Sequence, residues 1–137
     1  MTKWAHSLIR ISTYEVETLQ KRLAEIAARR VSAEMRVAAL DAEREVERER
    51  ARDDTEAAMW MPAYLNGWRA RRDAAQSQVE AVAQEERGAR EALAQAFEAQ
   101  KKFEHVAEMS RLQALSEAGK REAAMLDELA IIQRSAG

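Results

Sequence analysis

The side chains able to do chemistry are few and widely scattered in this sequence. Its two histidines, His6 and His105, lie far apart in the chain, and there is no cysteine. Zinc sites draw on closely spaced histidine and cysteine ligands, so the sequence has no metal-binding spacing. The four glycines are isolated from one another and form no phosphate-binding loop.

Catalytic groups are equally hard to assemble from these residues. No serine or threonine has a partner histidine that would activate it as a nucleophile. Acidic side chains are plentiful, but a pair of long helices offers no closed cleft that would desolvate them and shift their pKa values. We therefore predict a non-catalytic protein with no metal ion, cofactor or small-molecule substrate.

The composition is typical of long helices. Of 137 residues, 29 are alanine, 34% are charged and only one is proline. Alanine has the highest intrinsic helix propensity, and this mixture of alanine and charged residues is common in coiled coils. The chain should therefore bury a narrow seam between helices in place of a globular core.

The distribution of charge argues against a nucleic-acid partner. The 22 basic and 24 acidic residues are interleaved along the chain, whereas nucleic-acid binders usually concentrate lysine and arginine in a patch. No apolar run approaches the roughly 18–20 residues of a membrane span, and the first residues lack the apolar core of a signal peptide. Together with the absence of cysteine, these features predict a cytoplasmic protein.

A seam of residues at steps of three and four predicts a first helix from about residue 3 to about residue 60. Its members are Ile9, Ser12, Val16, Leu19, Leu23, Ile26, Arg30, Ala33, Val37 and Leu40. Beyond this stretch the seam turns polar, and glutamate–arginine pairs three residues apart should support the helix. Two such pairs are Glu45 with Arg48 and Glu49 with Arg52.

The strongest helix-breaking signals are Pro62 and the pair Asn66–Gly67, which place a turn between residues 60 and 68. A second helix should then run from about residue 68 to about residue 133. Its seam residues are Val79, Val82, Glu86, Ala89, Leu93 and Ala96, after which the heptad phase shifts to Leu112, Leu115, Leu126 and Leu129.

These elements predict an all-α fold, a long two-helix antiparallel coiled-coil hairpin that forms one domain over residues 1–137. A reversal near residue 65 would place opposite each other residues whose numbers add to about 130. Val37 would then face Leu93, and Arg44 would face Glu86.

Two apolar clusters are candidate partner-binding sites. The first lies at the predicted turn and consists of Trp60, Met61, Tyr64, Leu65 and Trp68. Aromatic residues and methionine are enriched at interfaces, so these side chains either form an exposed adhesive tip or pack together to close the hairpin.

The second cluster lies at the open end of the predicted hairpin. Leu8, Ile11, Ile131 and Ile132 fall beside the seam, so the other helix should not fully cover them. Exposed apolar surface of this kind indicates a binding partner.

Four runs of the sequence resemble the FliJ family of flagellar export proteins. They are SLIRISTYEVE at 7–17, LQKRLAEI at 19–26, FEAQKKFEHVAE at 97–108 and LDELA at 126–130. The length and the predicted hairpin match that family across essentially the whole chain.

The resemblance implies a coiled-coil stalk of the bacterial type III protein export apparatus. Its open end would enter the pore of the hexameric export ATPase, and the hairpin would couple that ring to the membrane export gate. It would lie at the cytoplasmic side of the inner membrane at the flagellar base, and export chaperones are possible further partners. The residues leave open whether the apparatus builds a flagellum or an injection needle. The alternative is a structural scaffold or tether with no export role.

Overall fold

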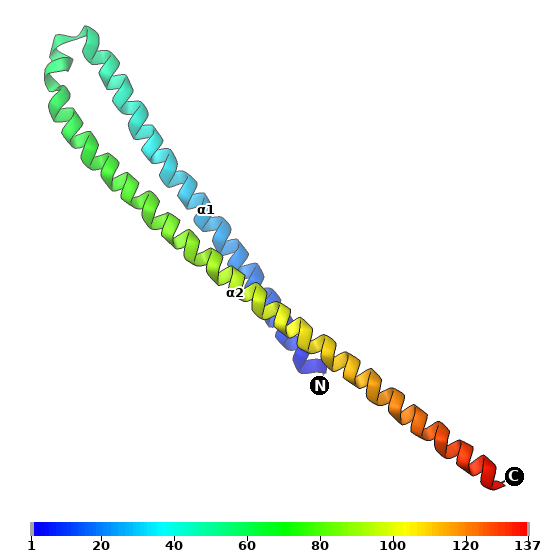
Figure 1. The fold of residues 1–137 in the computed structure, drawn as a ribbon. Coiled ribbons are helices and arrows are strands. Elements are labelled where there is room, and N and C mark those ends of the chain that lie inside the picture. The colour runs from blue at the N-terminus through cyan, green and yellow to red at the C-terminus, as the bar shows by residue number, and fades with distance from the viewer. Residues whose placement is uncertain (1, 137) are drawn as a thin grey trace. The chain divides into compact units, whose positions relative to one another are not determined.

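The computed structural model describes residues 2–136 and contains two long helices and no strand in that range. Helix α1 spans Thr2–Asp53 and helix α2 spans Thr55–Ala136. The two helices pack against each other as an antiparallel hairpin (Figure 1), which confirms the predicted fold class.

The hairpin consists of two compact units. The terminal unit combines Met1–Val16 with Gln95–Gly137, and the turn unit comprises Glu17–Ala94. Within each unit, a segment of α1 packs against a segment of α2.

The chain reverses at Asp54, so the predicted turn at 60–68 and both predicted helix ends beside it were wrong. Asp54 caps α2: its Oδ1 accepts hydrogen bonds from the backbone N–H groups of Glu56 at 3.0 Å and Ala57 at 3.3 Å. Its carbonyl accepts a third from Ala58 N–H at 3.0 Å. The first N–H groups of a helix have no partner within the helix, so an aspartate at this position starts α2 there.

The signals that suggested the later turn lie inside α2. Pro62 is a helical residue near the start of α2, and Gly67 is helical without a positive φ angle. A proline in a helix interior loses one backbone hydrogen bond and costs about 3 kcal/mol. Packing of α2 on α1 immediately after this point offsets that cost.

The earlier reversal also changes the register between the helices. The Arg44 guanidinium lies 4.6 Å from the centre of the Trp68 ring, and Arg30 pairs with Glu86. The residue numbers in these pairs add to 112 and 116. The predicted sum of about 130 was therefore too high, and Arg44 does not face Glu86.

The predicted seam itself is confirmed. Ile26, Val82 and Ala89 form a buried core cluster, and Leu23 packs against it. Ser12 is also buried in the seam, where its hydroxyl donates a 2.9 Å hydrogen bond to the Ile9 carbonyl of the preceding turn.

The expected ion pairs of the polar stretch are also formed. Arg48 lies 3.6 Å from Glu45, and Arg52 lies 3.1 Å from Glu49. All four side chains are exposed, so each pair contributes under about 1 kcal/mol.

Helix α2 is much longer than its partner, with 82 residues against 52 in α1. In the terminal unit it continues past the start of α1 to the C-terminal end, drawn in orange and red in Figure 1. Every residue from 111 to 136 is exposed, and we call this stretch the free segment. The prediction that Leu112, Leu115, Leu126 and Leu129 extend the seam was wrong, because α1 does not reach them.

The register can be tested by cross-linking. Cysteines at Leu23 and Ala89, which belong to one packed cluster, should form a disulfide within one chain, because a disulfide needs Cα atoms within about 7 Å. Cysteines at Val37 and Leu93 should not cross-link in the monomer. Gel mobility under non-reducing conditions measures both, and efficient cross-linking of the second pair alone would overturn the register.

Candidate functional site

Trp68, predicted as part of an adhesive tip, belongs to the core of the turn unit. It is only 5% exposed, and its indole N–H donates a 2.6 Å hydrogen bond to the Leu40 carbonyl. Arg44 covers its ring at 4.6 Å, within the range of a cation–π interaction. Trp68 is therefore buried against α1 and is not part of an exposed tip.

The remaining tip residues differ in exposure. Trp60 is 69% exposed, whereas Met61, Tyr64 and Leu65 are half-buried. Burial is the main factor that raises the pKa of the Tyr64 phenol. The neighbouring Met59 is 77% exposed and was not predicted as a site residue. Met59 and Trp60 together form an apolar surface at the start of α2, which we call the tip surface.

The structure does not bring the predicted open-end residues together. Ile11 is 63% exposed and Leu8 is half-buried on α1, at the level of α2 residues near 101 to 104. Ile131 and Ile132 are exposed near the end of the free segment. Between these levels lie about 27–30 helical residues, or roughly 40–45 Å at about 1.5 Å per residue. The single predicted cluster is therefore two separate apolar sites.

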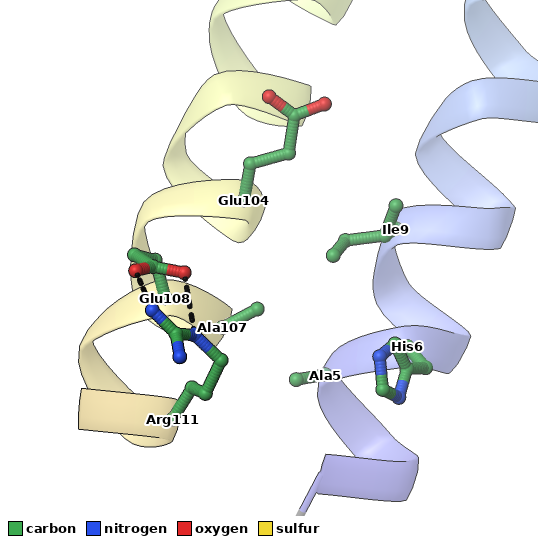
Figure 2. Close-up of a pocket in the computed structure, with 7 residues that line it drawn as sticks. All are labelled: Ala5, His6, Ile9, Glu104, Ala107, Glu108 and Arg111. Carbon is green, nitrogen blue, oxygen red and sulfur yellow. Dashed lines mark hydrogen bonds and ion pairs between the residues drawn. The ribbon is translucent and has the colours of Figure 1, made fainter. Parts of the chain in front are cut away.

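An open groove lies between the helices of the terminal unit (Figure 2). Its lining residues are Ala5, His6, Ile9, Glu104, Ala107, Glu108 and Arg111. Ala5 and Ala107 face each other across the groove, and their small side chains leave the space that forms it. On the rim, Arg111 binds both carboxylate oxygens of Glu108, at 2.7 and 3.1 Å, and this lowers the pKa of Glu108.

The seam contains two arginine–carboxylate layers. The buried Glu86 carboxylate accepts hydrogen bonds from Arg30 and, at 2.6 Å, from Arg90. Nearer the turn, Arg72 binds both oxygens of Asp41, at 2.8 and 3.3 Å. The hydrogen bonds from Arg72 hold the pKa of Asp41 below its ordinary value.

These groups are paired with arginines, and none is arranged as a nucleophile with its base. Among residues 2–136, no group of three or more histidine, cysteine, aspartate or glutamate side chains could hold a metal ion. In the same range, no helix combines the length and hydrophobicity needed to cross a membrane. What the described chain does offer is exposed apolar surface at the tip and on the free segment.

Met59 and the exposed leucines of the free segment were not predicted as partner-binding residues, and each had a signal in the sequence. Asp54-Thr55-Glu56 has the acidic start of a capped helix, which would have placed Met59 and Trp60 just after the turn. The shift in heptad phase before Leu112 indicates that the helix turns a different face outward beyond that point.

The chain is similar along its whole length to curated proteins of known name. Two strains of Caulobacter vibrioides each have a relative named "Flagellar FliJ protein" that is 53% identical over 137 residues. The match covers 100% of this chain and 99% of each relative.

The chain belongs to the FliJ family of flagellar proteins. The resemblance seen in the sequence is thereby confirmed. No profile of a known protein family matches the chain, and no solved structure matches it.

In this FliJ-family chain, Trp68 and Trp60 provide a matched comparison. Trp68→Ala should lower the free energy of unfolding by about 3–5 kcal/mol, because it removes a buried ring from the seam. Trp60→Ala should change it by no more than about 0.5 kcal/mol, because that side chain is exposed. Urea denaturation followed by far-UV circular dichroism measures both, and equal effects would contradict the assigned roles.

The Asp41–Arg72 pair has a testable pH dependence. Because the pKa of Asp41 is lower in the folded protein, the pair stabilises the fold above the unfolded value of about 3.9. That stabilisation is lost as the pH falls through the folded pKa. Arg72→Gln should raise the pKa of Asp41 toward about 3.9 in an NMR carboxylate titration. The pKa of Glu108, which Arg111 lowers, should stay unchanged and serves as the internal control.

Proposed function

We propose that this protein is the non-catalytic stalk of a bacterial flagellar type III protein export apparatus. In this proposal its open end inserts into the hexameric export ATPase, and the hairpin couples that ring to the membrane export gate. The observation that carries the proposal is the full-length, 53% identity to proteins named flagellar FliJ. The protein would act at the flagellar base, on the cytoplasmic side of the inner membrane.

The distribution of exposed apolar residues supports this role. The free segment presents apolar side chains without a partner helix, as a rod seated in a ring of subunits requires. Leu8 and Ile11 lie where the two-helix part begins, and Ile131 and Ile132 lie near the far end of α2. In our proposal all four bind the ATPase, the isoleucine pair deeper in the ring than the α1 pair.

The tip surface is suited to a different partner. Met59 and Trp60 lie in the turn unit, on the part of α2 that follows the reversal. Exposed aromatic and methionine side chains commonly anchor protein interfaces. We assign this surface to the export gate, with export chaperones as further partners of the hairpin.

Asymmetry gives such a stalk a way to act without chemistry. One hairpin inside a ring of six equivalent subunits touches them unequally, because its two helices present different side chains to different subunits. A ligand shifts a conformational equilibrium only by its differential affinity for the two states. Unequal binding would therefore bias individual ATPase subunits toward different conformations.

The test is calorimetric titration of the protein against the purified hexameric ATPase. Ile131→Ser with Ile132→Ser should weaken binding at least tenfold, since removing one apolar side chain from an interface costs about 1–2 kcal/mol. The double variant Leu8→Ser with Ile11→Ser should also weaken ATPase binding. Its effect should be independent of the isoleucine changes, because the two sites lie far apart along the terminal unit. Both variants should keep the far-UV spectrum of the wild type.

The control is Met59→Ser with Trp60→Ser, which should leave ATPase binding unchanged. Loss of binding in this variant, with normal binding in both terminal variants, would show that the hairpin is inserted the other way round. A wild-type protein that does not bind the ATPase at all would overturn the proposal.

A further inference from the structure

The free segment carries two pairs of leucines with a regular spacing. Leu112 and Leu115 are followed two heptads later by Leu126 and Leu129. These four side chains are 45–60% exposed. Residues seven and fourteen positions apart share one face of a helix that packs in a coiled coil, so the four leucines form a single stripe.

The residues beside this stripe widen it. Ala118, Ala123, Met125, Ala130 and Ile132 occupy the positions that flank the leucines in the heptad. Charged residues fall mostly on the other side of the helix, with Lys120, Arg121, Asp127 and Glu128 among them. We call the leucines and these flanking residues the free face.

The free face is not the face that packs on α1. The last buried seam residue of α2 is Ser110, and Leu112 lies about 200° further round the helix. Helix α2 therefore turns one side toward α1 and presents a different side over the free segment. A longer α1 that followed the same seam would still leave the free face uncovered.

We propose that, in the protein not bound to the ATPase, a second copy of this chain covers the free face, running antiparallel to the first. The leucine pattern is nearly symmetric about the point between Lys120 and Arg121. Two antiparallel copies in register would place Leu112 opposite Leu129 and Leu115 opposite Leu126 of the other copy. All four leucine layers are filled, and the two copies form a closed two-fold interface.

The one charged residue within the stripe also fits this arrangement. In the same register, Glu122 comes opposite Gly119 of the other copy. No other group lies within 4 Å of the position that a Cβ at Gly119 would occupy, so there is open space at that level. The Glu122 stem can cross this space and keep its carboxylate in water, as long charged side chains do at interface edges.

Charge and area are both compatible with a dimer. Residues 111–136 contain four basic and four acidic side chains, so two copies do not repel each other through net charge. Six large apolar side chains on the free face, at on the order of 100 Å² each, would bury roughly 1,200 Å² over two copies. Specific interfaces bury about 1,200–2,000 Å². The area estimated here is at the lower end of that range, so we expect a weak dimer.

The first experiment measures the mass of the full-length protein alone by analytical ultracentrifugation, from micromolar to submillimolar concentration. Wild type should shift from monomer to dimer, and Leu115→Ser with Leu126→Ser should weaken association at least tenfold. Ile131→Ser is the matched control: it removes a side chain that is 61% exposed on the other side of the same segment. That variant should dimerise as wild type does, and a wild type that stays monomeric throughout would overturn the proposal.

The second experiment measures orientation without altering the free face. Because the chain has no cysteine, single cysteines at Lys120 and Arg134 can carry spin labels. Helices packed about 8–10 Å apart would bring the two labels at 120 close together, whereas labels at 134 would lie about 40 Å apart. Short distances at both positions would indicate a parallel dimer and overturn the antiparallel proposal. Neither experiment contains the ATPase, so their outcome is independent of the proposed export function.

Discussion

The position of the reversal at Asp54 fixes which residues of α1 lie opposite which residues of α2. The aspartate accepts the first unpaired N–H groups of α2 through its side chain and its carbonyl. Both helices rise by the same distance per residue. If the turn moved by one residue along the chain, each residue of α1 would therefore face a residue of α2 two positions away from its present partner. The same position determines which residue of α2 lies opposite the N-terminal end of α1, and hence where the free segment begins.

Polar layers in the seam reinforce this register. Arg30 and Arg90 pair with the buried Glu86, and Arg72 pairs with Asp41. Removing a partner from a buried charge is costly, so a slipped register that separated Glu86 from Arg30 of α1 and left it only Arg90 of its own helix would be disfavoured. Such layers add little net stability compared with apolar residues, and we attribute to them the choice of one register over its neighbours.

Helix α2 carries two different surfaces along its length. Up to Ser110 it turns a seam of small and apolar residues toward α1, and beyond that it presents the free face. In this FliJ-family chain, the two-helix part buries most of its seam residues between α1 and α2. The free segment, a single helix, leaves its apolar residues exposed. Exposed leucines at this density carry a risk of nonspecific association, and a specific partner for them removes it.

The sequence by itself determined the helices, the seam and the all-α hairpin, because these depend on local helix propensity and on steps of three and four residues. It also placed two polar residues, Ser12 and Arg30, in the seam. The turn was decided by a competition that the local pattern does not resolve. Pro62 and Gly67 disfavour a helix, but the Asp54 cap and the packing of Trp68 against Leu40 outweigh them.

Whether an apolar residue is buried also depended on tertiary structure. Trp68 and Trp60 belong to one aromatic-rich stretch of the sequence, yet only Trp68 faces α1. The separation of Ile11 from Ile131 has the same origin, since it follows from the register and the unequal helix lengths, which only the packed hairpin reveals.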